Sequence, residues 1–345
     1  MQAPQPPAPS PPIAFSVPKA HPKNPQQADI GGTNAPIAHS DTQAGGLELS
    51  AQRTLKTADF GSLQHAAEHY LKLVRVRPKR ASMAVASPVA GDEIRLTNRA
   101  WSFSQTELKR SLGLAELKVI NDFGAVAYAV PALQAEDRVL LHGSDALPPT
   151  GPVTVLGPGT GLGVALLIGD PEAGWRVVET EGGHVSFAPQ GEEETRICRW
   201  ISARFGRCSN ERLLCGAGLA HIDAALAAGD ETRVPVDWAR QLRDPAAIVA
   251  AALDGHDLNA RRTLARFCAV LGSVAGDAAL IHGARTVMIA GGIVPRFIPF
   301  LRSSAFRERF LAKGRFAAYL EGVSIQVVTH PQPGLLGAAV ALGEP

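Results

Sequence analysis

The stretch that decides the fold is VTVLGPGTGLGVALLI at residues 153–168, which reads as strand, glycine-rich turn, strand. The apolar runs on either side of the turn have the length and composition of buried strands. Between them, glycines alternate with other residues in GPGTGLG. Glycine lets a backbone turn tightly and approach a ligand, and a turn with inward-pointing N–H groups binds anions. We therefore interpret Gly159, Thr160 and Gly161 as a phosphate-binding turn.

Two further glycine pairs follow possible strands, in QADIGGTNAPIAH (27–39) and in TVMIAGGIV (286–294). A glycine pair alone is more often a simple hairpin turn. No Gly-Lys pair exists in the chain, which excludes a Walker A loop, and G-x-G-x-x-G fails at 157–163. A phosphate clasp built from separate glycine turns remains. The residues of interest are Asp29, Gly31, Gly32, Thr33, Asn34, Gly291 and Gly292.

Composition sets the class of protein. The chain has 345 residues, 46% apolar and 19% charged, which suits a soluble protein of one large or two domains. Its net charge is +2 without a basic block, so we expect no nucleic acid and no membrane as partners. We expect no signal peptide, and no apolar run of the about 18–20 residues that a membrane-spanning helix needs. The four cysteines form no C-x-x-C pair, which indicates reduced thiols and a cytoplasmic location.

Strands and helices alternate along the chain, which predicts an α/β protein. Residues 1–27 carry nine prolines and are expected to be a disordered tail. The other expected elements are a helix at 60–75, strands at 82–87 and 117–120, a helix from the Ser104–Glu107 capping box to Gly113, a mostly helical stretch at 192–282, and a strand at 286–294.

Polar side chains with chemical potential follow these strands. Asn121 and Asp122 end the strand 117–120, where open α/β sheets place ligands, although Asp122 equally suits the cap of a following helix. Glu181 and His184 flank two glycines in ETEGGHVSFAP. Glu211 opens ERLLCGAG and has a competing explanation as a helix-start glutamate. Asn98 adds an amide. Such a set suits hydrogen bonding to a polyhydroxylated small molecule, with one acid free to accept a proton.

The chain resembles the bacterial glucokinase family, the non-ROK branch within the actin/hexokinase/Hsp70 superfamily. The matching stretches occur in family order from residue 28 to about 340: ADIGGTNA, ASPVAGDEIRLTN, VINDF, VLGPGTGLGVALL, EGGHVSFAP, ERLLCGAGL, FCAVLGSVAGDAAL, IAGGIVPRF and HPQPGLLGAA. The resemblance implies a two-domain, actin-like (ribonuclease H-like) α/β fold with an interdomain cleft. Residues 28–135 and 330–345 would form the small domain and 136–329 the large one.

The resemblance also implies roles in ATP-dependent phosphorylation of D-glucose, feeding glycolysis. Asp122 would be the general base. Asn98, Asn121, Glu181, His184 and Glu211 would hold the glucose hydroxyls. ATP phosphates would lie against Asp29, the 31–34 turn and the 159–161 turn, and adenosine against Gly291 and Gly292. Mg²⁺ would be held mainly through ATP and water, with Asp29 as a further ligand, and the protein would be a homodimer.

Four departures from the family pattern stand out. PKNPQQ precedes Asp29 where an apolar strand is usual, Pro36 replaces an arginine, His39 replaces a leucine-like residue, and Gly124 replaces a hydroxyl residue. Proline inside a sheet loses a ladder hydrogen bond, so we expect a shorter, more mobile or less stable first hairpin.

Two alternatives to a glucokinase stay open: a catalytically weak sugar-binding or regulatory protein, and a kinase for another hexose.

Overall fold

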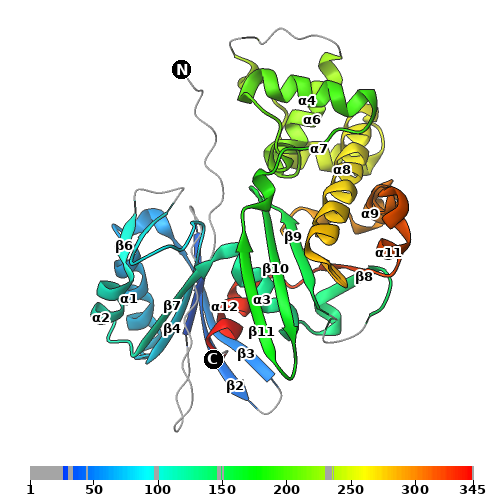
Figure 1. The fold of residues 1–345 in the computed structure, drawn as a ribbon. Coiled ribbons are helices and arrows are strands. Elements are labelled where there is room, and N and C mark those ends of the chain that lie inside the picture. The colour runs from blue at the N-terminus through cyan, green and yellow to red at the C-terminus, as the bar shows by residue number, and fades with distance from the viewer. Residues whose placement is uncertain are drawn as a thin grey trace.

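Two β-sheets organise the chain, one in each of two lobes (Figure 1). The computed structural model describes residues 26–29, 34–43, 46–96, 101–145, 149, 151–229, 235 and 237–343. The expected α/β fold is confirmed in this mixture of sheets and helices. The proline-rich residues 1–25 lie outside the described part of the chain.

The sheet of the small lobe has the strand order β3-β2-β1-β4-β7. β1, β4 and β7 run parallel, and β2 and β3 add an antiparallel hairpin at one edge. Helices α1 (Leu63–Val74) and α2 (Gln105–Ser111) belong to this lobe, as does a short hairpin of β5 (Glu93–Arg95) and β6 (Ser102–Ser104). The strands of the main sheet are β1 (Gln26–Asp29), β2 (Asn34–Gln43), β3 (Gly46–Lys56), β4 (Arg80–Val85) and β7 (Glu116–Asn121).

The sheet of the large lobe has the order β11-β10-β9-β12-β13-β8, with β9, β12 and β13 parallel. Its strands are β8 (Arg138–His142), β9 (Val153–Pro158), β10 (Leu162–Asp170), β11 (Gly174–Thr180), β12 (Thr286–Ile289) and β13 (Ser324–Val328). The helices of this lobe are α4 (Gly191–Phe205), α5 (Asn210–Leu213), α6 (Gly216–Ala228), α7 (Pro245–Asp254), α8 (Leu258–His282), α9 (Ile298–Ser303), α10 (Phe306–Leu311) and α11 (Ala317–Glu321).

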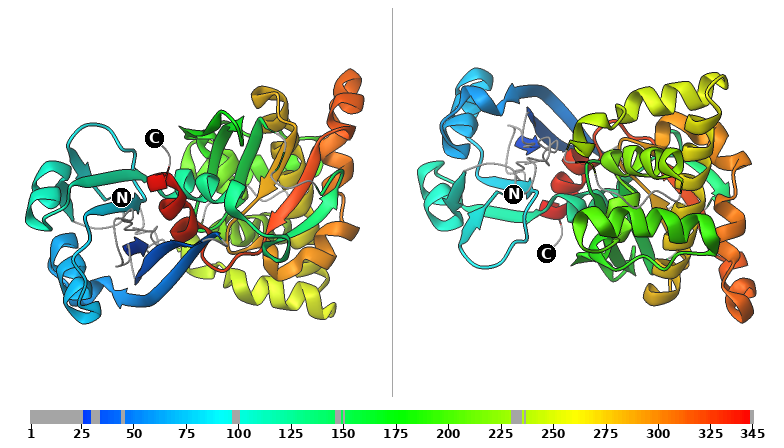
Figure 2. Two further views of the ribbon diagram at one scale, coloured as in Figure 1. Left: turned by 90° about the horizontal axis from the view of Figure 1, so that it is seen from below. Right: turned by 90° about the horizontal axis from the view of Figure 1, so that it is seen from above.

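Two helices join the lobes. α12 (Pro333–Gly343), the last helix of the chain, returns to pack on β4 and β1 of the small sheet, while α3 (Asp122–Ala129) packs on β10 and β11 of the large sheet. Both further views place α12 at the junction (Figure 2). A Cβ atom added at Gly337 would lie 1.6 Å from the carbonyl oxygen of Ala125, so the backbones of α12 and α3 touch directly. The first turn of α3 is thereby held between the two sheets.

The first hairpin forms with its unusual residues in place. β1 begins at Gln26, two residues before the expected start, and β2 and β3 have ten and eleven residues. The expectation that this hairpin is shorter, more mobile or less stable than in relatives stays a prediction. Pro36 faces Thr54 of β3, next to a register shift between Ile37 and His39. Proline is tolerated at such irregularities because the regular ladder is already interrupted.

The expectation of no apolar run long enough to span a membrane is corrected by the long helix α8. Phe267 to Ala284 contains only Asp277 as a charged side chain, and α8 has the length and composition that could span a membrane. However, 67% of its most apolar window is buried inside the protein, as expected for the central helix of a packed domain. Phe267 is fully buried and meets Phe297 edge to face, with ring centroids 6.3 Å apart.

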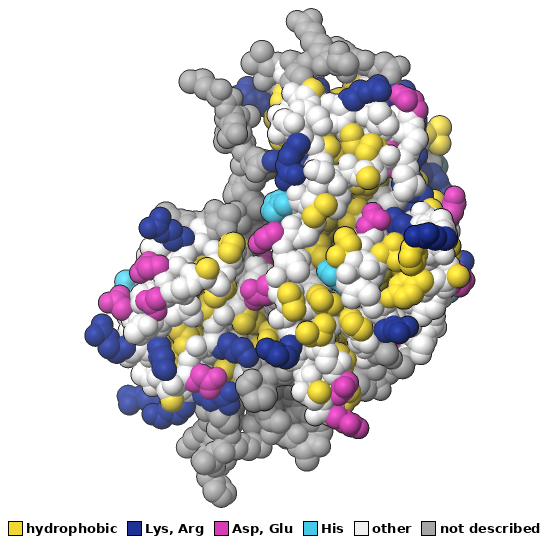
Figure 3. Space-filling view, in the orientation of Figure 1, with side chains coloured by type: hydrophobic (Ala, Val, Ile, Leu, Met, Phe, Trp, Pro, Cys, Tyr) yellow, Lys and Arg dark blue, Asp and Glu magenta, His cyan; other side chains and the backbone are white. Residues whose placement is uncertain are grey.

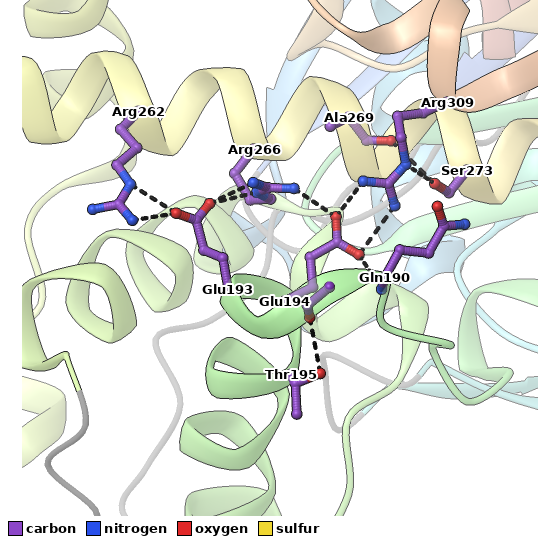
Figure 4. A network of polar contacts seen from close by, with 10 residues as sticks. Gln190, Glu193, Glu194, Thr195, Arg262, Arg266, Ala269, Ser273 and Arg309 are labelled. Atoms are coloured by element: carbon purple, nitrogen blue, oxygen red, sulfur yellow. Dashed lines mark hydrogen bonds and ion pairs between the residues drawn. The ribbon is translucent and has the colours of Figure 1, made fainter. Parts of the chain in front are cut away.

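A buried charge network ties α4 to α8 and α10 (Figure 4). Glu194 is only 1% exposed; Arg266 donates to it at 2.8 Å, and Arg309 at 2.6 and 3.0 Å. Burial alone would raise the pKa of Glu194, but the hydrogen bonds from Arg309, Gln190 and Arg266 hold that pKa below its ordinary value. The carboxylate is therefore ionised and compensated, which makes the network a structural brace of the large lobe.

Candidate active site

The carboxyl ends of β1, β4 and β7 meet at one edge of the small sheet. Asp29 ends β1 opposite Ala84, and Asn121 ends β7 opposite Val85. The backbones of Asp29 and Asn121 therefore share this edge, two strands or roughly 10 Å apart. The side chain of Asp29 lies outside the described part, as do Asn98 and the Gly31–Thr33 turn; Asn34 is described only as the first residue of β2.

Asn121, not Asp122, caps helix α3. The Asn121 Oδ1 atom accepts the N–H groups of Phe123 at 2.9 Å and of Gly124 at 3.2 Å. The competing explanation of Asp122 as the helix cap is therefore wrong, because its carboxylate is not the group that caps α3.

Burial raises the pKa of Asp122 to about 6; the backbone N–H of Phe123 opposes the shift, and the charges of Glu181 and Glu179 add to it. A carboxylate with that pKa is ionised at neutral pH yet unusually basic.

Glu181, His184 and Glu211 form a chain of polar side chains at the large lobe. His184 closes a 3-10 turn (Gly182–His184), and its Nε2 atom lies 3.8 Å from Glu181 Oε2, while its Nδ1 atom lies 3.8 Å from Glu211 Oε1. The backbone of this loop is fixed by Arg207, which donates to the His184 carbonyl at 2.7 Å. These separations exceed hydrogen-bond lengths, so all three side chains retain free hydrogen-bonding capacity toward a ligand.

Glu211 does more than begin a helix. Its Oε2 atom accepts the N–H of Leu162 at 3.0 Å, and a Cβ atom at Gly161 would lie 2.5 Å from the same oxygen. A larger residue at position 161 would therefore displace the Glu211 carboxylate. The carboxylate joins the His184 loop to the GPGTGLG turn.

The second and third glycine turns lie side by side because β9 and β12 are parallel neighbours. A Cβ atom at Gly157 would lie 2.5 Å from the Ala290 carbonyl oxygen, and one at Gly291, whose φ is +88°, would lie 2.4 Å from that of Pro158. The second turn is closed by a 2.8 Å hydrogen bond from the Gly159 N–H to the Gly161 carbonyl. Gly292 borders open space, with no atom within 4 Å of a Cβ built there.

Phe123 links the candidate base to the glycine turn. A Cβ atom at Gly163 would lie 2.1 Å from the Phe123 ring, so this ring rests directly on the backbone of β10 just after the GPGTGLG turn. The preceding residue, Asp122, is thus held close to that turn. In the space-filling view, acidic side chains and a histidine line the border of the large lobe that faces the small one (Figure 3).

Glu179 did not feature among the expected site residues. It lies on β11, and its Oε1 atom accepts the N–H of Asn121 at 2.7 Å. A signal was present in the sequence, because residues i and i+2 of an extended segment share a face. Glu179 stands two positions before Glu181 in ETEGGH.

Comparisons with known proteins identify the family of the chain. A family model described as Glucokinase matches residues 27–345. Glucokinase of Zymomonas mobilis is 43% identical over 316 residues, covering 91% of this chain and 95% of that protein. The crystal structure of glucokinase from an Antarctic psychrotroph is 36% identical with a TM-score of 0.80, covering 92% of this chain and 97% of that one.

A more distant structure shares the fold alone. It is a ROK family glucokinase of Streptomyces griseus in complex with glucose and AMPPNP, 19% identical with a TM-score of 0.55, covering 91% of this chain and 97% of that one. The fold is thus that of a sugar kinase. The chain belongs to the glucokinase family.

Proposed function

We propose that Asp122 is the general base with which this protein transfers the γ-phosphoryl group of ATP to the 6-hydroxyl of glucose. Family membership and the identity to bacterial glucokinases support ATP-dependent glucose phosphorylation as the activity. The single observation that carries the role of Asp122 is its place in the first turn of α3, with the Phe123 ring on the backbone that follows the second glycine turn.

Asp122 accepts the hydroxyl proton as the sugar oxygen attacks phosphorus. Phosphoryl transfer depends mainly on positioning and charge neutralisation, and a base within hydrogen-bond reach adds about 10²–10⁴-fold. Because burial raises the pKa of Asp122 to about 6, the base is ionised at neutral pH. We expect kcat/KM for glucose to fall as the pH drops below about 6.

The polar chain of Glu181, His184 and Glu211 binds the other glucose hydroxyls, together with Asn98 and Asn121. The Oδ1 atom of Asn121 is committed to the helix cap, so its Nδ2 atom, with one long contact of 3.5 Å to the Ser87 carbonyl, is the group available to a sugar. A hexose that lacks one of these hydroxyls, or has it inverted, leaves a polar group unpaired at a cost of about 1–3 kcal/mol.

ATP phosphates bind between the first turn (Asp29 to Asn34) and the second (Gly159 to Gly161), and adenosine lies against Gly291 and Gly292. The adjacency of the second and third turns supports one continuous nucleotide site. Mg²⁺ is held mainly by phosphate oxygens and water, its usual ligands in kinases. Asp29, a hard oxygen donor whose backbone lies at the same sheet edge as Asp122, suits this cation; the metal would neutralise charge on the transferring group.

The finer classification is also a proposal: an actin-like, ribonuclease H-like fold of the non-ROK branch. The small domain would comprise residues 28–135 and 330–345, extended by the two β1 residues before Ala28, and the large domain residues 136–329. The packing of α3 and α12 between two sheets supports this division. Closure of the cleft would exclude water as a competing acceptor. A homodimer follows from the resemblance, and light scattering on the purified protein tests it. The cytoplasmic location follows from the cysteine pattern.

Asp122→Asn tests the role of the base. We expect glucose-dependent ADP formation with MgATP to fall by about 10²–10⁴-fold while glucose binding, measured by calorimetry, persists. Asp254→Asn, at the exposed last residue of α7, is the matched control and should leave turnover unchanged. A fully active Asp122→Asn variant would refute the role. Glucose binding without turnover in the wild type would instead support a sugar-binding regulatory protein, and turnover with another hexose alone would redirect the substrate.

A further inference from the structure

Glu179 connects the two sheets at the residue before Asp122. It lies on β11, the edge strand of the large sheet, and its Oε1 atom accepts the N–H of Asn121, the last residue of the edge strand β7 in the small sheet, at 2.7 Å. The outward N–H groups of an edge strand have no ladder partner in their own sheet. One carboxylate from the opposite lobe therefore fixes the backbone from which α3 begins.

Gly124 leaves the room that this carboxylate occupies. A Cβ atom at position 124 would lie 2.7 Å from Glu179 Oε1 and 3.0 Å from its Cγ atom. Gly124 is not among the described residues with positive φ, so its backbone conformation does not itself require glycine. Glycine inside a helix costs roughly 0.5–1 kcal/mol relative to alanine. The close approach of Glu179 accounts for a glycine at this position.

The charge of Glu179 acts on the base as well. α12 packs on α3 without contributing a charged side chain, and the one charged residue of β10, Asp170, lies at the end of the strand away from the glycine turn. On β11, Arg176 is three residues from Glu179 and therefore faces the other side of the strand; on β7, Lys118 is directed to the Ala341 carbonyl of α12. Among the side chains that the structure describes, Glu181 and Glu179 carry the charges that act on Asp122, and both raise its pKa.

We propose that Glu179 is a positioning residue for phosphoryl transfer: it holds the Asn121–Asp122 backbone from the opposite sheet and occupies the space beside Gly124. This inference rests on the proposed role of Asp122 as the base. Glu179 acts through Asp122 and needs no contact with glucose or ATP.

Two substitutions separate the hydrogen bond from the charge. Glu179→Gln keeps an acceptor oxygen and the shape but removes the charge, so kcat at pH 8 should stay near the wild-type value while the acid limb of kcat/KM moves to lower pH. Glu179→Ala also removes the hydrogen bond, and kcat should fall about fivefold, the equivalent of about 1 kcal/mol, with KM for ATP unchanged. Glu172→Ala, an exposed glutamate in the turn between β10 and β11, should change neither quantity.

Gly124 allows a rescue experiment. Gly124→Ala should lower kcat and the thermal midpoint, because the methyl group displaces the Glu179 carboxylate. In Gly124→Ala/Glu179→Ala the obstruction is gone, so the thermal midpoint should recover to that of Glu179→Ala or above it. The midpoint measurement does not depend on catalysis and remains informative for an inactive variant.

An acid limb and kcat unchanged in both Glu179 variants would overturn the positioning role, and a Gly124→Ala variant that matches the wild type in midpoint and kcat would overturn the packing relation. If Asp122→Asn is inactive while the Glu179 variants are silent, this inference fails and the base assignment stands. If Asp122→Asn is active, the base assignment itself fails.

Discussion

Asp122 should destabilise the folded protein at neutral pH, because the raised pKa that makes it a stronger base also makes its ionised form unfavourable in the native state. Burial raises the pKa of this carboxyl from 3.8 to about 6, so the native state retains the proton at pH values where the unfolded chain has lost it. With a raised native pKa, the stability contributed by the group is complete below pH 3.8 and is lost as the pH rises through 6. Asparagine at this position cannot ionise and avoids that loss.

The magnitude follows from linkage. The raised pKa of Asp122 destabilises the native state relative to the unfolded state by about 1.6 kcal/mol at pH 5 and about 3 kcal/mol at pH 8. Asp122→Asn should therefore gain about 1.4 kcal/mol more free energy of unfolding at pH 8 than at pH 5, whatever pH-independent effect the amide itself has. Removing the base should thus make an inactive protein whose stability exceeds that of the wild type by more at pH 8 than at pH 5.

Urea denaturation of wild type and variant at the two pH values measures this difference. The control Asp254→Asn, at an exposed site, should show the same difference from wild type at pH 5 and at pH 8. An Asp122→Asn variant whose stability relative to wild type does not change between these pH values would refute the raised pKa. A relative stability that declines with rising pH would show that the native pKa is lowered instead.

Two further substitutions test the packing that supports the site. Glu194→Ala should destabilise the protein by about 3–5 kcal/mol in urea denaturation, because it leaves two arginines without their buried partner. The control Glu192→Ala, at an exposed carboxylate, should change the free energy of unfolding by no more than about 0.5 kcal/mol. Equal effects of the two substitutions would contradict the role of Glu194 as a structural brace. Gly163→Ala should drive the Phe123 ring off β10 and lower kcat at least tenfold, the equivalent of about 1.4 kcal/mol; wild-type kcat in this variant would mean that the ring does not place the base.

The parts of the site that sit in one continuous stretch could be predicted from the sequence. The alternating glycines from 157 to 163 predict a phosphate turn by local pattern alone, whereas the proposed role of Asp122 as the base came from the family resemblance. The strand predicted at 117–120 was near β7 (Glu116–Asn121), whereas the stretch predicted at 286–294 is a strand only as far as Ile289.

What could not be predicted depends on which distant segments touch. The contact of Phe123 with Gly163, the adjacency of Gly157 and Gly291, and the hydrogen bond from Asn121 to Glu179 each join residues at least 40 positions apart, and only the sheet order brings them together. The cap of α3 was ambiguous between Asn121 and Asp122 because both types favour the position.

A structure of the protein with glucose and a non-hydrolysable ATP analogue tests the central claim most directly. The account predicts the glucose 6-hydroxyl oxygen within hydrogen-bond reach of an Asp122 carboxylate oxygen, about 2.6–3.2 Å, and the terminal phosphate against the Gly159–Gly161 turn. A 6-hydroxyl directed away from Asp122 and paired with another acid, such as Glu181, would contradict it.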